Sequence, residues 1–329
     1  MPPGSGPYCF RIHGAIYHKT SHLRPNEPGK EKYAQLYILD ADQALRQRMN
    51  IVENASLNPN LLMMLDSIIR NINPYAEAFK MLKEFEEDTL RYHGVQTAAD
   101  IRMYIKGENI THSEHRGRYN APKENEVAAV FKSTDGVPPT NRDIVIHPRS
   151  GGLINISPLN CNLEPMTYVL FFPYGDKGFT VEEQYTELQF YSHRVSIRQE
   201  YFNPVLYGRK LFQQYLVDSY VKVEGNRLSY LRNNQKKLRV ETYMGLADHI
   251  YRAAEKTGAK PGIPIILPST FIGSQRCMQQ NYQDAMAIVR DFGKPDLFLT
   301  FTCNPKWTEI TQNLFLVQKA HDRPNIHPL

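Results

Sequence analysis

Basic side chains gather in one segment of the sequence, residues 222–239. They are accompanied by a single acid, Glu224, so this segment holds the whole formal net charge of +5. The basic residues are Lys222, Arg227, Arg232, Lys236, Lys237 and Arg239. Such a stripe would attract a nucleic-acid backbone through phosphate contacts and counterion release. A solvated helix face would contain the same residues, so both interpretations stay open.

Aromatic residues accompany this segment and could bind the bases of a single strand. Four of the 20 tyrosines flank it: Tyr215, Tyr220, Tyr230 and Tyr243. An aromatic ring that stacks on a base typically contributes about 1–3 kcal/mol to single-strand binding. Tyrosine at helical spacing also packs against its own core, and the sequence does not decide between the two roles.

Patterns that would support catalysis by this chain are weak or missing. Thr111–His115 (THSEH) has two histidines three apart, but its Gly, Ser and Asn neighbours indicate an exposed loop rather than a metal site. The sequence contains no GxxxxGK[ST] phosphate loop and no GxSxG elbow. Its four cysteines form no CxxC pair, which argues against a zinc knuckle or a disulfide framework. We expect no metal, cofactor or catalytic residue in this chain.

Hydrophobic patterning predicts that an α+β fold positions these residues. The N-terminal region, residues 1–179, is expected to be mixed. Strands are predicted at Phe10–His18 and Ala34–Asp40, then helices over residues 40–92 that are interrupted at Asn73-Pro74. Further strands are predicted at Glu126–Phe131, Arg142–His147, Gly151–Ser157 and Thr167–Gly175.

Two more regions follow in this interpretation. Residues 180–257 read as a helical block with the basic face, broken near Asn203-Pro204 and Gly208. Residues 258–329 read as a helix at Gln279–Phe292, a strand at Asp296–Cys303 and a helix at Lys306–Ala320. One strand cannot form a sheet alone, because its backbone groups need partner strands. The last domain is therefore expected to be truncated.

The composition fits a globular intracellular protein. Apolar residues make up 41% and charged residues 22% of the 329 residues, which is an ordinary balance for a folded chain. No stretch approaches the roughly 20 apolar residues that cross a bilayer, and the opening residues lack a secretory apolar block. No membrane association is expected.

Long strings of the sequence resemble Helitron transposon proteins. The longest is Gly262–Trp307, which is similar to their helicase-like N-terminal region. Shorter similar strings are Arg209–Arg239, Glu164–Phe179, Arg142–Leu153 and Phe10–His18. The stretch FLTFTCNP resembles the first Rep motif, a strand of the nuclease sheet. Its supporting residues here would be Thr300, Phe301, Thr302, Asn304, Pro305 and Trp307.

The resemblance implies a role in rolling-circle transposition of chromosomal DNA in the nucleus. In that family a Rep-type HUH endonuclease follows this region, with two histidines that hold a divalent metal, Mg or Mn, and a tyrosine that attacks DNA. An ATP-driven helicase lies further on. This chain lacks the His-hydrophobic-His motif, since neither His321 nor His327 belongs to such a pair, and no tyrosine follows Tyr282.

We therefore expect the DNA-binding portion of a Rep nickase/helicase, with an incomplete Rep-like sheet at its C-terminus and no catalysis of its own. Single-stranded DNA is the expected partner, together with the nuclease and helicase domains of the parent protein. Two alternatives remain: a fragment or decayed copy of an intact nickase-helicase, and a protein-interaction scaffold that does not contact DNA.

Overall fold

The structure of the protein is a computed structural model. It describes residues 18–25, 27, 29–93, 101–105, 128–132, 144–146, 154–180, 184–198, 202–235, 267–297, 299–300, 303–316, 318–323 and 326. The chain divides into two compact units, Met1–Leu216 and Val217–Leu329. Helices predominate over short strands in the described residues, which confirms an α+β composition in outline. The domain boundaries expected at residues 179 and 257 stay predictions.

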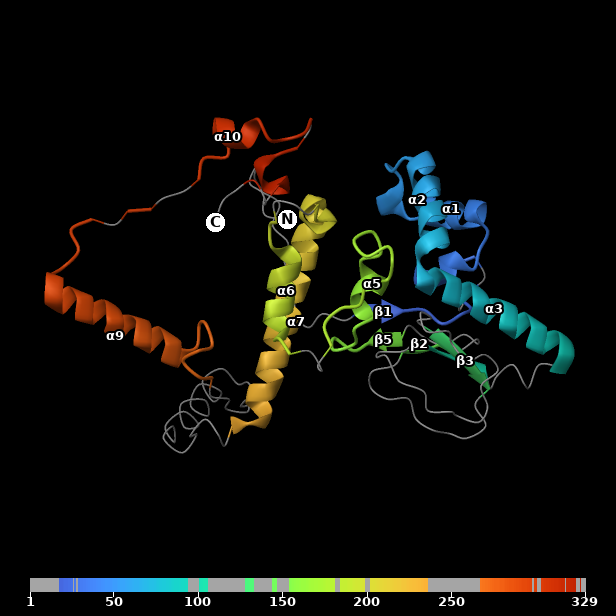
Figure 1. The fold of residues 1–329 in the computed structure, drawn as a ribbon, viewed down its shortest axis with the longest axis horizontal. Coiled ribbons are helices and arrows are strands. Elements are labelled where there is room, and N and C mark those ends of the chain that lie inside the picture. The colour runs from blue at the N-terminus through green and yellow to red at the C-terminus, as the bar shows by residue number, and fades with distance from the viewer. Residues whose placement is uncertain are drawn as a thin grey trace, which may run out of the picture. The chain divides into compact units, whose positions relative to one another are not determined.

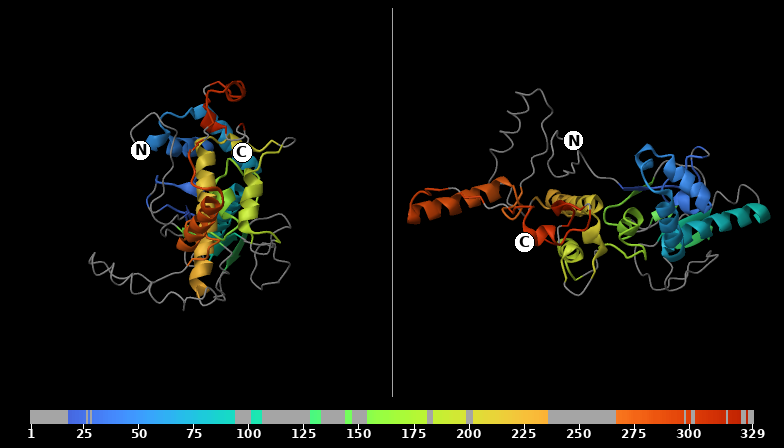
Figure 2. Two further views of the ribbon diagram at one scale, coloured as in Figure 1. Left: turned by 90° about the vertical axis from the view of Figure 1, so that its left-hand side faces the viewer. Right: turned by 90° about the horizontal axis from the view of Figure 1, so that it is seen from above.

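The first unit contains a helical group, which the sequence predicts from residue 40 onward (Figures 1 and 2). Its elements are η1 (Tyr33–Tyr37), α1 (Ala41–Met49), η2 (Val52–Asn54), α2 (Pro59–Ile72) and α3 (Pro74–His93). The predicted break between α2 and α3 is confirmed. Asn73 makes it, because its side chain accepts hydrogen bonds from the backbone N–H groups of Tyr75 and Ala76 at 3.0 and 3.2 Å.

Two small antiparallel sheets complete this part of the first unit. β1 (His18–Thr20) pairs with β5 (Ile154–Ile156), and β2 (Ile101–Ile105) lies between β3 (Ala128–Lys132) and β4 (Ile144–Ile146). The last three strands of the sequence prediction before residue 160 are thus confirmed at their centres. Of the strand expected over residues 10–18, only His18 is described.

One hydrophobic cluster joins α3 to both sheets. It contains Leu23, Tyr75, Ala78, Phe79, Leu82, Met103, Ile105, Ile156 and Leu163. Phe79, Leu82, Met103 and Ile105 have no exposed surface. Because the members come from segments far apart in the sequence, this core fixes how α3 sits on the strands.

The strand predicted at residues 34–40 is wrong, since this segment begins with the 3-10 helix η1. Its backbone carbonyls find partners other than a neighbouring strand. Arg70 donates to the carbonyl oxygens of Leu36 and Tyr37 at 2.7 and 2.8 Å, and buried Gln35 donates to the carbonyl of His22 at 2.7 Å. Side chains thus supply the bonds that a sheet would have provided.

The strand predicted at residues 167–175 is also wrong. The helix α5 (Leu163–Thr167) is followed by tight turns, in which the N–H groups of Phe171 and Phe172 both donate to the carbonyl of Tyr168. The three rings lie at i, i+3 and i+4, and all three pack around Tyr215 with centroid distances of 5.0–5.9 Å. The apolar run therefore follows a turn-like period rather than the alternation of a strand.

The helical block continues with α6 (Glu187–Val195), η3 (Pro204–Tyr207) and α7 (Lys210–Asn233). The predicted breaks at Asn203-Pro204 and Gly208 are confirmed. Asn203 caps η3 by accepting the N–H of Val205. At Gly208 a Cβ atom would lie 2.3 Å from the ring of Phe171, so only glycine lets the chain approach the aromatic cluster.

The second unit contains α9 (Gln275–Phe292), α10 (Thr308–Thr311) and η6 (Ala320–Asp322). α9 confirms the predicted helix and starts four residues earlier, at Gln275, directly after the N-cap Ser274. The described residues of 296–303 form no strand, because no partner strand is present in the part of the second unit that is described. The helix predicted over 306–320 is wrong except at Thr308–Thr311. No helix among the described residues is long and apolar enough to cross a membrane.

Candidate nucleic-acid interface

The basic segment lies on α7 only in part, and its described members point in different directions. Lys222, Arg227 and Arg232 are five residues apart, and each such step turns about 140° around a helix. Arg227 and Arg232 are exposed, whereas Lys222 is buried with 7% of its surface accessible. Lys222 is therefore not part of a solvent-facing stripe. Lys236, Lys237 and Arg239 lie outside the described residues, as do the histidines of residues 111–115.

The flanking tyrosines divide between the two roles that the sequence left open. Tyr215 is buried in the aromatic cluster, which is the packing role. Tyr220 and Tyr230 are exposed on α7, and Tyr230 lines a small pocket with Arg227 and Phe271. Tyr243 is outside the described residues. Of the three described tyrosines, only the exposed pair is placed where a base could reach it.

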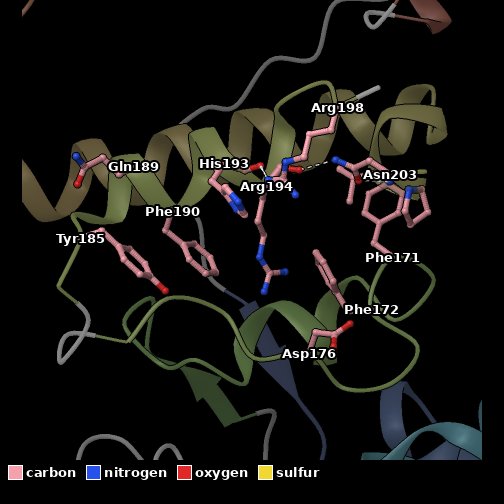
Figure 3. A pocket seen from close by; sticks show the side chains of 12 residues that line it. Phe171, Phe172, Asp176, Tyr185, Gln189, Phe190, His193, Arg194, Arg198 and Asn203 are labelled. Atoms are coloured by element: carbon pink, nitrogen blue, oxygen red, sulfur yellow. Dashed lines mark hydrogen bonds between the residues drawn. The ribbon is translucent and has the colours of Figure 1, made fainter. Parts of the chain in front are cut away.

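A larger pocket lies in the first unit and was not anticipated from the sequence. It has a volume of about 710 Å³ and is built from the turns after α5, from α6 and from η3 (Figure 3). Its main lining side chains are Phe171, Phe172, Asp176, Tyr185, Phe190, His193, Arg194 and Arg198. We call it the aromatic pocket. Its size falls in the range of pockets that bind small molecules or single groups of a larger ligand.

Arg194 lies between two rings of the aromatic pocket (Figure 3). Its guanidinium carbon is 4.3 Å from the Phe172 centroid and 4.7 Å from the Phe190 centroid. Tyr185 extends this wall, since its ring is nearly parallel to that of Phe190 at a centroid distance of 6.2 Å. Cations over ring faces are stabilising by about 0.5–2 kcal/mol. The pocket thus combines planar rings with positive charge, a pairing that suits flat, electron-rich ligands.

A buried carboxylate behind the pocket holds Arg194 in place. Glu164 on α5 is 2% exposed, and its Oε2 lies 3.3 Å from Nη1 of Arg194. The hydroxyls of Tyr191 and Tyr215 donate to the same carboxylate at 2.6 and 3.0 Å. Arg194 also donates to the carbonyl of Lys177. Three segments of the first unit therefore meet at one charged group.

The backbone at residue 178 is shaped to this carboxylate. A Cβ atom at Gly178 would lie 2.8 Å from Oε1 of Glu164, which is closer than real Cβ contacts allow. Its N–H donates to the carbonyl of Cys161 at 2.7 Å, so the chain is held close to α5. Glycine is required here for the close approach and not for an unusual φ angle.

Burial raises the pKa of Tyr191 far above its ordinary value, and the neighbouring Glu164 carboxylate raises this pKa further. The pKa of Tyr75, whose hydroxyl donates to Asn162 at 2.7 Å, is also raised, mainly by burial. In the unfolded chain both tyrosines would lose their protons near pH 10.

We therefore expect the folded protein to lose stability above about pH 10. Below that pH the tyrosines are protonated in both states, whereas above it only the unfolded state releases protons. Each such tyrosine lowers the free energy of unfolding by about 1.4 kcal/mol per pH unit. Urea titrations between pH 9 and 11 measure this slope. Tyr75→Phe should make it shallower, and Tyr174→Phe, at an exposed tyrosine, should not; equal slopes would contradict the prediction.

The residues carried over from the Rep motif lie in exposed turns of the second unit. Thr300, Asn304, Pro305 and Trp307 are exposed, and Phe301 and Thr302 are outside the described residues. The Asn304 side chain accepts the N–H of Lys306 at 3.0 Å, a local turn contact. Across the described residues, no three His, Cys, Asp or Glu side chains are placed to hold a metal ion.

Comparison with known protein families matches one part of the chain, and the matched part begins at a lining residue of the aromatic pocket. Residues 190–327 match the family model for the Helitron helicase-like domain at the N-terminus. The match covers less than half of the 329 residues, and over this range the chain is similar to that domain. The match confirms the family that the strings at 209–239 and 262–307 resemble; the strings at 10–18, 142–153 and 164–179 lie outside it. No curated protein and no solved structure matches the chain.

The matched residues include the part of the pocket lining from Phe190 to Val205, and the other lining residues, from Phe171 to Gln189, precede the match. Sequence reasoning missed this site because its residues come from three segments with no fixed spacing. A signal was present: the string Glu164–Phe179 contains Glu164, Phe171, Phe172 and Asp176, and it resembled the same family.

Proposed function

We propose that this Helitron-type protein binds single-stranded DNA as part of a rolling-circle transposition machinery. The observation that carries the proposal is the aromatic pocket, where Tyr185, Phe172 and Phe190 form a wall around Arg194. Aromatic rings combined with arginine are the usual means of binding unpaired bases without sequence preference. A base in a duplex is already stacked, so the pocket favours single strands.

Exposed positive charge at the pocket and on α7 supports the same proposal. Arg198 is exposed at the pocket, and Arg227 and Arg232 are exposed on α7. Lys236, Lys237 and Arg239 follow in the sequence and stay candidates for phosphate contacts. Such contacts release counterions, so the affinity is expected to fall as salt rises. The Rep-like nature of residues 258–329, nuclear localisation, and the use of Mg or Mn and ATP by linked domains belong to this proposal as family expectations.

The test is a titration of the purified chain against a fluorescently labelled single strand at several salt concentrations. Tyr185→Ala should weaken binding by about 1–3 kcal/mol, which is about 5- to 150-fold in Kd. Tyr282→Ala is the matched control, because Tyr282 is an exposed tyrosine on α9 that is not among the lining residues of the pocket. Its Kd should equal that of the unaltered protein.

Two results would overturn the proposal. One is no binding of single strands at low salt, and the other is binding that neither salt nor Tyr185→Ala weakens. If the chain instead forms a stable oligomer or a complex with another protein and ignores DNA, the interaction-scaffold alternative is favoured.

A further inference from the structure

A second cavity of the first unit contains buried hydrogen-bond donors without partners. Its volume is about 370 Å³, and its lining includes β1, the η1 segment, the end of α1 and residues 165–169. Among the described side chains that line it, Lys19 and Arg48 are basic and none is acidic. The cavity shares no lining residue with the aromatic pocket.

Thr20 is the first of these donors. Only 3% of its surface is exposed, and its hydroxyl oxygen Oγ1 has no hydrogen-bond partner among the described residues. His18 and Thr20 alternate along β1 and so share one side of the strand. A buried hydroxyl without a hydrogen-bond partner lowers the stability of the fold by about 1–3 kcal/mol, so native proteins rarely contain one.

Arg48 provides the second donor and an uncompensated charge. Its Nη2 lies 2.7 Å from Oδ1 of buried Asp66, and Nε of Arg70 lies 2.6 Å from Oδ2 of the same aspartate. Two guanidinium groups thus share one carboxylate, which leaves one positive charge over. Nη1 of Arg48 is buried and has no hydrogen-bond partner in the part of the chain that the structure describes. The other two nitrogens of Arg70 donate hydrogen bonds to backbone carbonyls, whereas Arg48 lines the cavity.

We infer that this cavity binds a phosphate group. One such anion would neutralise the surplus charge and accept hydrogen bonds from both the Thr20 hydroxyl and Nη1 of Arg48. No carboxylate among the described lining residues could do so. Arginine is well suited to this because its donors match the geometry of phosphate oxygens. The phosphate could come from a free ion or nucleotide or from a DNA backbone, and the recognising chemistry is the same.

The first experiment uses inorganic phosphate and the full chain, with thermal unfolding as the readout. Phosphate should raise the Tm of the unaltered protein above that in sodium chloride of matched ionic strength, since a ligand that binds only the folded state stabilises it. Thr20→Val should raise the Tm in chloride, because it removes an unpartnered buried hydroxyl, yet abolish most of the phosphate response. Its phosphate affinity should fall about tenfold or more.

Two further variants separate binding from packing. Thr20→Ser keeps the hydroxyl and should keep the phosphate response. Thr89→Val, on α3, removes a hydroxyl that donates to the Phe85 carbonyl and should leave the response unchanged. The inference is overturned if phosphate does not raise the Tm of the unaltered protein. It is also overturned if phosphate raises the Tm of Thr20→Val as much as it raises the Tm of the unaltered protein.

Single-strand titration of the same variants distinguishes the phosphate source. If the site holds a backbone phosphate, Thr20→Val weakens DNA binding together with the phosphate response. If it holds a free ion or nucleotide, only the phosphate response is lost. Both results uphold the site, and neither depends on the aromatic pocket, whose failure Tyr185→Ala reports separately.

Discussion

Replacing Glu164 by glutamine should lower the free energy of unfolding by about 3–5 kcal/mol, the usual cost of removing one partner from a buried ion pair. Glutamine has nearly the same volume, so the loss comes from charge and hydrogen bonding rather than from a cavity. Arg194 would keep its charge with 15% of its side chain exposed and no carboxylate beside it. The amide could still accept a bond from one tyrosine hydroxyl but would present an N–H₂ group to the other.

Urea unfolding followed by circular dichroism measures this change. Glu84→Gln is the matched control, since Glu84 is exposed on α3, and its effect should stay within about 0.5 kcal/mol. The double variant with Arg194→Met should lose less unfolding free energy than the two single variants lose together, because both substitutions remove the same interaction. A loss below about 1 kcal/mol for Glu164→Gln would show that the carboxylate does not organise this part of the first unit.

Phe79→Ala should cost a similar amount, about 3–5 kcal/mol, for a different reason. The Phe79 ring has no exposed surface and belongs to the cluster that joins α3 to Met103, Ile105 and Ile156. Truncation removes buried apolar contacts and leaves a cavity that residues from several segments cannot all move to fill.

Two companion variants test that explanation in the same unfolding assay. Phe79→Leu fills most of the space and should cost about 1.5 kcal/mol or less. Lys80→Ala changes the exposed neighbour on α3 and should have almost no effect. If Phe79→Ala were as mild as Phe79→Leu, the core described here would not be the one that holds α3 against the strands.

The sequence by itself determined the helices that have a regular apolar spacing or a clear residue signal at their ends. The α2 and α3 helices follow from their apolar spacing, and their separation follows from Asn73-Pro74, because a side-chain cap and a proline act within a few residues. The family was likewise evident from long strings, which the match over residues 190–327 confirmed.

Tertiary structure decided the secondary structure of short apolar segments whose sequence does not distinguish a strand from a turn. The sequence predicts a strand for the run from Tyr168 to Phe172, but its rings pack around Tyr215, more than 40 residues later. The sequence predicts the same for the segment after Tyr33, and Arg70 of a distant helix satisfies its carbonyls instead. Long-range partners of this kind override local preference.

The candidate sites depended even more on the third dimension. The basic segment was a continuous feature of the sequence, yet the helix turns its members apart and buries Lys222. Conversely, Glu164, Arg194 and Tyr215 have no telling spacing and meet at one carboxylate. Thr20 and Arg48 meet at one cavity in the same way. Charge and residue type are written in the sequence, but burial and convergence, which decide what a side chain can bind, arise only when the chain packs.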